Sequence, residues 1–152
     1  MRQKEAVLKD LIILLTALKI YCKDAHYAFK GEGFKSLHEW ADEIGEPLEG
    51  YLDEMKENWF LFAGIDVPRG VMLNNAAVDY VPIEVSTNEG VLNNLLALIT
   101  MCHNHLMEID AKEPGINDLL GRLDTHLMKH IALLNLALNN VKDASDVDNK
   151  ND

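Results

Sequence analysis

The sequence predicts an all-α protein that folds as one bundle of four long helices. Apolar residues recur at helical spacing in four separate segments, and glycine, proline or capping residues lie between these segments. No segment shows the alternation of apolar and polar residues that is typical of a half-buried strand. The length of 152 residues is that of one domain with a sizeable core.

The first predicted helix covers residues 5–29. Its apolar positions fall on one face, and Gly31 and Gly33 follow as helix-ending residues. His26 lies one turn before the predicted end, where a histidine is more often a favourable charge on the helix dipole than a metal ligand. It gains a metal-binding role only from its partners.

The second predicted helix reaches about residue 63. Ser36 and Glu39 have the spacing of a capping box at its start, and a start a few residues earlier stays open as the alternative. Gly45 and Pro47 lie in its middle. An interior proline costs roughly 3 kcal/mol and bends the axis, so we expect a kink there.

A connection of roughly twenty residues, 64–85, follows and is too long for a tight hairpin. It fits a crossover between two antiparallel helix pairs and leaves room for one short helix near residues 73–80. Residues 86–89, Ser-Thr-Asn-Glu, offer caps for a third helix over 89–111.

Pro114 and Gly115 break the third helix, and the fourth is predicted over 117–141. A short link, a long crossover and a short link give the helices ferritin-like connectivity. We therefore assign residues 1–141 to a single ferritin-like four-helix bundle domain. Residues 142–152 are polar and net acidic, and they are predicted to be a flexible C-terminal tail.

The chain has a net charge of −11, from 14 basic against 25 acidic residues. This balance disfavours attraction to nucleic-acid phosphates, and no local concentration of lysine or arginine offsets it. Cys22 and Cys102 are too few for a disulfide framework and indicate buried thiols in a reducing compartment. Because no signal peptide and no membrane-spanning apolar run is present, we expect a cytoplasmic protein without a membrane partner.

One imidazole and three carboxylates share a face of the second predicted helix. With about 100° of rotation per residue and His38 at zero, Asp42 falls at about 40°, Asp53 at about 60° and Glu57 at about 100°. His26, in the preceding helix, adds a second imidazole. Nitrogen and oxygen ligands in this mixture suit iron, manganese or zinc rather than copper(I).

The acidic face has a second interpretation. Glu46 and Glu49 fall on the same stripe, and an acidic helix face is usually only a solvated face. Fifteen residues of helix also separate His38 from Asp53, which is about 22 Å of rise. One chain therefore cannot close a site from all of these residues, and a two-fold interface between copies is required.

A di-iron site inside one bundle would need two Glu-x-x-His pairs on facing helices, and the sequence has none. Four more histidines lie in the last two predicted helices. We expect packing or surface hydrogen bonding from them: His103, His105, His126 and His130.

The stretch from His26 to Glu57 resembles the Dps mini-ferritins, a family named for DNA protection during starvation. The shared pattern is a histidine, an aromatic residue, a Lys-Gly pair, a phenylalanine, a second histidine and an aspartate at fixed spacing. Asp53-x-x-x-Glu57 follows eleven residues later. The resemblance covers nearly the whole chain, weakens between residues 67 and 85, and returns in 117–120 and 129–131.

The resemblance implies a dodecameric shell built from two-fold dimers. It also implies ferroxidase centres, di-iron or mononuclear, at the dimer interface, where zinc can substitute for iron. His26, His38 and Asp42 would come from one subunit, and Asp53 and Glu57 from its mate, as the catalytic and metal-binding set. Such centres oxidise iron(II), preferably with hydrogen peroxide and also with dioxygen. The ferric mineral is stored in the hollow shell, which protects against oxidative stress.

The chain departs from the family pattern at several positions. Tyr27 stands where the family usually has a tryptophan near the metal. Asp118 matches one acid of the three-fold pore through which iron enters, but the second expected acid falls on Met128. Other acids of that region could substitute, namely Asp110, Glu113 and Asp124.

DNA binding in the family depends on a lysine-rich terminal tail. This chain has only Arg2 and Lys4 before its first predicted helix, so we expect no useful affinity for duplex DNA at physiological salt. Two other interpretations stay open. One is a structural shell of the same fold that binds metal without turnover, and the other is a monomeric helical interaction module.

Overall fold

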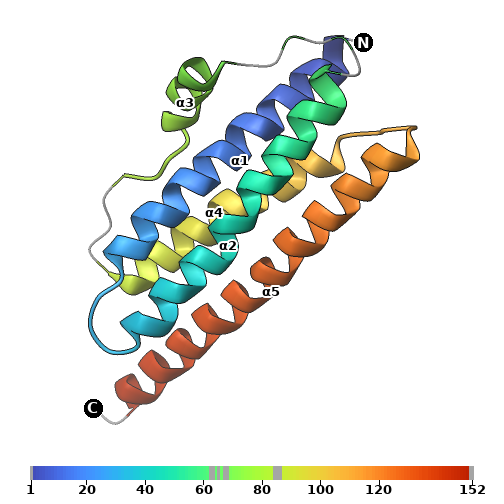
Figure 1. Ribbon diagram of the computed structural model, residues 1–152. Helices are drawn as coiled ribbons and strands as arrows, with labels where there is room; N and C mark the ends of the chain where they lie inside the picture. The colour runs from blue at the N-terminus through green and yellow to red at the C-terminus, as the bar shows by residue number, and fades with distance from the viewer. Residues whose placement is uncertain (1, 62–63, 65, 67–68, 84–86, 151–152) are drawn as a thin grey trace.

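The structure, a computed structural model, consists of helices joined by turns and loops, with no strand among the residues it describes (Figure 1). It describes residues 2–61, 64, 66, 69–83 and 87–150, and the side chains of 5–58, 64, 66, 69–83 and 87–140. The predicted all-α class is confirmed. The four long helices that form the bundle are α1 Arg2–Ala28, α2 Phe34–Met55, α4 Asn88–Met107 and α5 Pro114–Lys150.

Apolar side chains of all four long helices form the core. α1 packs against both α2 and α4, while α5 packs against α4 and α2. Burying one large apolar side chain stabilises the fold by roughly 1.5–3 kcal/mol. Among the described side chains, most of the large, fully buried ones come from α1, which α2 and α4 contact: Leu8, Leu11, Ile12, Leu14, Leu15, Leu18, Ile44, Leu48, Met55, Leu95 and Ile99.

The crossover contains the predicted short helix. It is α3, Gly70–Val78, which begins three residues earlier than expected and lies against α1 on the outside of the bundle (Figure 1). Leu73 and Ala77 are buried there, whereas Val71 and Met72 are exposed. Although α3 is mostly apolar, no helix of the described residues is both long and apolar enough to cross a membrane.

The second helix begins two residues before Ser36, which agrees with the earlier start that the sequence left open. α2 starts at Phe34, with Gly33 as its N-cap at a φ of 76°, and no side chain caps it. The predicted capping box at Ser36 and Glu39 is therefore wrong. Gly33 reaches the left-handed conformation that ends the turn, so the helix starts two residues before Ser36.

α2 runs through Pro47 as a continuous helix and passes directly into a π-helix, η1 Lys56–Leu61. The predicted end near residue 63 lies outside the described part of the chain. Gly45 has a packing role, because a Cβ at this position would lie only 2.6 Å from Cβ of Cys22 on α1. The glycine therefore permits the close approach of α1 and α2.

α4 begins one residue before its predicted start, and α5 begins three residues before its own. α4 begins after Thr87, whose Oγ1 accepts a 3.0 Å hydrogen bond from Gly90, as the predicted caps require. Pro114 is the first residue of α5 rather than a mere break, since a proline at that position loses no hydrogen bond.

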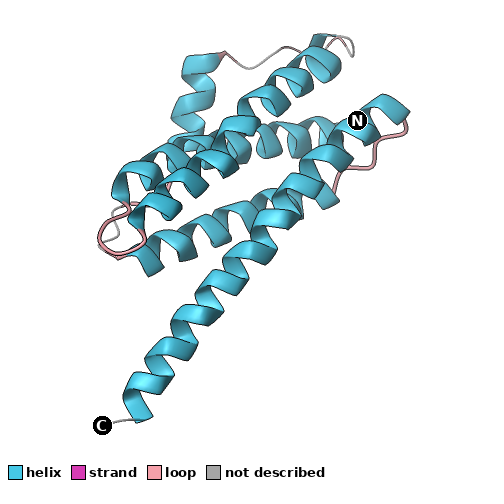
Figure 2. Cartoon of the chain, turned by 60° about the horizontal axis from the view of Figure 1, so that its bottom comes forward, coloured by secondary structure: helices cyan, strands magenta, loops and turns pink. Residues whose placement is uncertain are grey.

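α5 also continues past the predicted end at residue 141 and reaches beyond the other helices (Figure 2). The predicted flexibility of residues 142–152 stays a prediction, and residues 151–152 lie outside the described part.

Candidate metal half-site

His26 and His38 lie on either side of the turn between α1 and α2. His26 is in the last turn of α1, and His38 is in the second turn of α2. Between them, Gly31 and Gly33 have φ angles of 71° and 76°, which glycine adopts without strain. The chain therefore reverses tightly, and the two histidines meet.

A reciprocal pair of hydrogen bonds holds the two imidazole rings. Nδ1–H of His26 donates to the backbone carbonyl of His38 at 3.0 Å, and Nδ1–H of His38 donates to the backbone carbonyl of His26 at 2.6 Å. The rings stack with centroids 3.4 Å apart and planes at 27°. Because a carbonyl only accepts, each Nδ1 carries a proton. Nε2 is therefore the nitrogen through which each ring, when neutral, can bind a metal ion.

Asp42 lies one turn beyond His38 on α2 and joins this pair. Its Oδ2 is 3.1 Å from Nδ1 of His26, and its Oδ1 is 3.8 Å from Nζ of Lys23. With 27% of its side chain exposed, the Asp42 carboxylate stays accessible to an incoming ion. We call His26, His38 and Asp42 the half-site.

Lys23 is a member of this group that the sequence did not point to. Its Nζ lies 5.8 Å above the centroid of the Tyr27 ring as well as near Asp42. A signal was present, because Lys23 precedes His26 by three residues and so shares its face of α1. The ammonium group neutralises part of the charge that a metal cation would otherwise meet.

Tyr27, at the aromatic position of the motif, is 73% exposed. Its ring meets the His26 ring edge-on, with 5.0 Å between the centroids. The phenol therefore lies beside the half-site and faces solvent.

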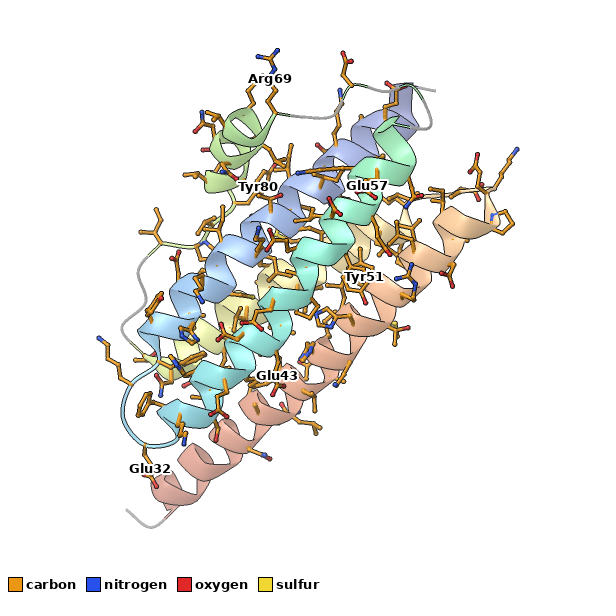
Figure 3. All side chains as sticks on the ribbon, in the orientation of Figure 1. Glu32, Glu43, Tyr51, Glu57, Arg69 and Tyr80 are labelled. Carbon is orange, nitrogen blue, oxygen red and sulfur yellow. The ribbon has the colours of Figure 1, made fainter. Side chains whose placement is uncertain are left out.

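Asp53 and Glu57 lie apart from the half-site. Both are exposed, Asp53 near the end of α2 and Glu57 in the first turn of η1. Figure 3 labels Glu32 in the turn before α2 and Glu57 in η1 after it, so the two residues lie at opposite ends of α2. Across the described side chains of one chain, no three His, Cys, Asp or Glu residues are placed to hold a metal ion.

Glu57 lies in the first turn of the π-helical segment η1. The angle of about 100° assumed a regular α-helix, whereas a π-helix bonds i to i+5 and turns less per residue. The angle calculated for a regular helix therefore does not give the direction of Glu57.

The four remaining histidines are hydrogen-bonded within the bundle, as expected. Their partners are Asp124 for His103 at 2.6 Å, the Met101 carbonyl for His105 at 3.2 Å, the Ile44 carbonyl for His126 at 2.9 Å and Trp40 for His130 at 3.0 Å. Each therefore has a structural role in one chain.

Asp118, the expected pore acid, lies near the start of α5 with 70% of its side chain exposed. Its Oδ2 accepts a 3.0 Å hydrogen bond from Nε of Arg122, which also donates to Glu54 at 3.1 Å. Of the substitute acids, Asp124 is paired with His103, while Asp110 and Glu113 are exposed.

Among the predicted site residues, the structure brings together His26, His38 and Asp42 and leaves Asp53 and Glu57 separate. A comparison of this chain with models of known protein families finds no match, and a comparison with curated proteins finds none either. The geometry of the half-site is therefore what indicates a function.

Proposed function

We propose that this protein is a ferroxidase of the mini-ferritin type, which oxidises iron(II) at a centre shared between two copies of the chain. The observation that carries the proposal is the reciprocal hydrogen bonding of His26 and His38 through Nδ1, which leaves Nε2 of each ring to bind a metal ion, while Oδ2 of Asp42 lies 3.1 Å from Nδ1 of His26. Two imidazole nitrogens and a carboxylate are a donor set that suits iron(II).

One chain supplies only part of this centre. In the proposal, Asp53 and Glu57 of the partner subunit complete it across a two-fold axis, and each dimer holds two equivalent centres. An open groove of about 440 Å³ between α1 and α2 is lined by Asp42 and Lys23, and a partner's side chain can approach the half-site from there. Asp53 and Glu57 of this chain are exposed, so in the proposal they complete the centre of the partner subunit in turn.

Iron(II) is the substrate of the proposed reaction. Hydrogen peroxide takes one electron from each of two iron(II) ions and, with two protons, becomes two molecules of water, so no hydroxyl radical is released. Dioxygen is the less preferred oxidant. Hard carboxylate oxygens stabilise the iron(III) product. In the proposal, a ferritin-like dodecameric shell stores that product as mineral and so protects against oxidative stress.

A second candidate is a shell of the same fold that binds metal ions without turnover. Lys23 favours it, because an ammonium group 3.8 Å from Asp42 competes with a metal cation. η1 favours it as well, because Glu57 lies in a π-helical turn and not in a regular α-helix, and a ligand displaced by about 1 Å can abolish a site.

Anaerobic titration with iron(II), followed by hydrogen peroxide, separates the two candidates. The ferroxidase predicts saturable binding and a fast ferric absorbance change that Asp53→Ala and Glu57→Ala each abolish. Glu43→Ala removes another exposed acid from α2, outside the groove beside Asp42, and is the matched control, with turnover kept. Binding without oxidation would favour the second candidate, and absence of binding would overturn both.

The assembly has its own test. Native mass spectrometry is expected to give a dodecamer that dissociates through dimers. A strictly monomeric protein would leave every half-site incomplete and would contradict the proposal.

A further inference from the structure

The turn that joins the two histidines has little packing of its own. Residues 30–36 are all exposed, and a Cβ added at Gly31 or Gly33 would meet nothing within 4 Å. The two glycines are therefore needed because of their positive φ angles and not because of a close contact. Something other than burial must keep this turn in one conformation.

Asn88, at the start of α4, is hydrogen-bonded to this turn. Its Oδ1 accepts a 3.0 Å hydrogen bond from the backbone N–H of Lys30, and its Nδ2 donates a 2.7 Å hydrogen bond to the backbone carbonyl of Lys30. Within the described part of the chain, no other side chain hydrogen-bonds to residues 30–33. One carboxamide thus satisfies both backbone groups of one residue, which requires a donor and an acceptor side by side.

Asn88 is itself held firmly. Thr87 caps α4 through the Oγ1 that accepts from Gly90, and α4 packs along α1. The two Asn88–Lys30 hydrogen bonds therefore connect an exposed turn to the first residue of a packed helix. Functional groups are placed most reproducibly when their supports lie on such rigid elements.

The position of Lys30 matters for the half-site because it lies inside the loop that the histidines close. His26 precedes it by four residues and His38 follows it by eight. The two Nδ1–carbonyl bonds fix the rings to each other, and each bond crosses between α1 and α2. A turn that shifts would move the start of α2 against the end of α1 and would misalign both rings.

We infer that Asn88 is a positioning residue, which holds the α1–α2 turn through Lys30 so that His26 and His38 keep the geometry needed to bind a metal ion. The effect on metal binding rests on the function proposed above. The effect on the turn does not, so the two can fail separately.

The test compares Asn88→Ala with Asn94→Ala in the full-length protein. Asn94 also reaches from α4 to α1, donating a 3.2 Å hydrogen bond to the Tyr21 hydroxyl, but it does not touch the turn. Zinc(II) alone is the probe, titrated against a chromophoric chelator, and melting temperatures are recorded in parallel. Hydrogen-exchange mass spectrometry of residues 26–38 follows the turn without metal.

We expect Asn88→Ala to lower zinc affinity about 10-fold, the loss typical when a supporting partner of a ligand is removed. The exchange of the Lys30 amide should become faster. Asn94→Ala should leave both unchanged at a similar melting temperature. Asn88→Asp keeps the acceptor for Lys30 N–H and a favourable charge at the start of α4, so it folds and gives an intermediate affinity.

Equal zinc affinity in the wild type and both Asn88 variants would overturn the inference, as would an equal loss in Asn94→Ala. A wild-type protein that binds no zinc would overturn the proposed function. Faster hydrogen exchange confined to the Asn88 variants would then still support the inference that Asn88 holds the α1–α2 turn. Unchanged exchange would overturn that inference.

Discussion

The indole Nε1–H of Trp40 on α2 donates a 3.0 Å hydrogen bond to Nδ1 of His130 on α5. This bond requires an unprotonated Nδ1, because a protonated ring would turn a second N–H toward the indole. His130 is only 2% exposed. Burial, with smaller contributions from His126 and Lys129, lowers its pKa from 6.5 to about 4.

We predict that the free energy of unfolding falls as the pH drops from about 6.5 to about 4. In this range the unfolded chain binds a proton at His130 that the folded protein does not. The contribution of His130 is complete above the unfolded pKa, and at about 1.4 kcal/mol per pKa unit its loss amounts to about 3 kcal/mol near pH 4. Urea unfolding at several pH values measures this loss in the free energy of unfolding.

His130→Gln keeps an acceptor for Trp40 and does not titrate, so its stability should depend less on pH over this range. His105→Gln changes a histidine that only bonds to the carbonyl one turn before it, and it is the control that should keep the wild-type slope. Identical pH dependence in the wild type and His130→Gln would contradict the assignment.

A second prediction concerns Gly45. Gly45→Ala puts a methyl group 2.6 Å from Cβ of Cys22, at the root of a side chain that cannot swing away. We expect a loss of about 1–3 kcal/mol in the free energy of unfolding, because α1 and α2 must move apart. Gly50→Ala, in the same helix with nothing within 4 Å, should instead gain up to about 1 kcal/mol. If both variants unfold at the same urea concentration, the close packing is refuted.

Lys23 supplies a third prediction. Lys23→Met removes the ammonium group 3.8 Å from Asp42 while keeping a long side chain over Tyr27. Two unit charges at this distance interact by about 1 kcal/mol in water, so zinc affinity should rise by roughly fivefold. Lys19→Met breaks a similar 3.8 Å pair with Glu49 and is the control. An affinity that does not rise above that of the control would show that Lys23 does not compete with the cation.

The long helices could be predicted from the sequence because their apolar spacing is the same signal that packing requires. The residues at which these helices begin and end could not be predicted with the same accuracy. Pro114 stops one helix and starts the next, and only the fold decides between these roles. At Pro47 the lost backbone hydrogen bond is outweighed by the packing of α2, whose Ile44 and Leu48 are fully buried.

The candidate ligands were also accessible to sequence reasoning, since His26, His38 and Asp42 have a distinctive spacing. Their mutual hydrogen bonds were not accessible, because these depend on how the Gly31–Gly33 turn folds in three dimensions. The partners of Asp53 and Glu57 depend on assembly, which no spacing within one chain specifies.

The most direct measurement is ferroxidase activity after subunits of two inactive variants are mixed. His26→Ala/His38→Ala and Asp53→Ala/Glu57→Ala each destroy both centres of their own homodimers. A mixed dimer keeps one intact centre, with the histidine side from the second variant and the acidic side from the first. A centre shared across the two-fold axis therefore predicts that a statistical mixture regains about a quarter of wild-type activity. No recovery in a mixture that native mass spectrometry shows to contain mixed dimers would contradict a shared centre.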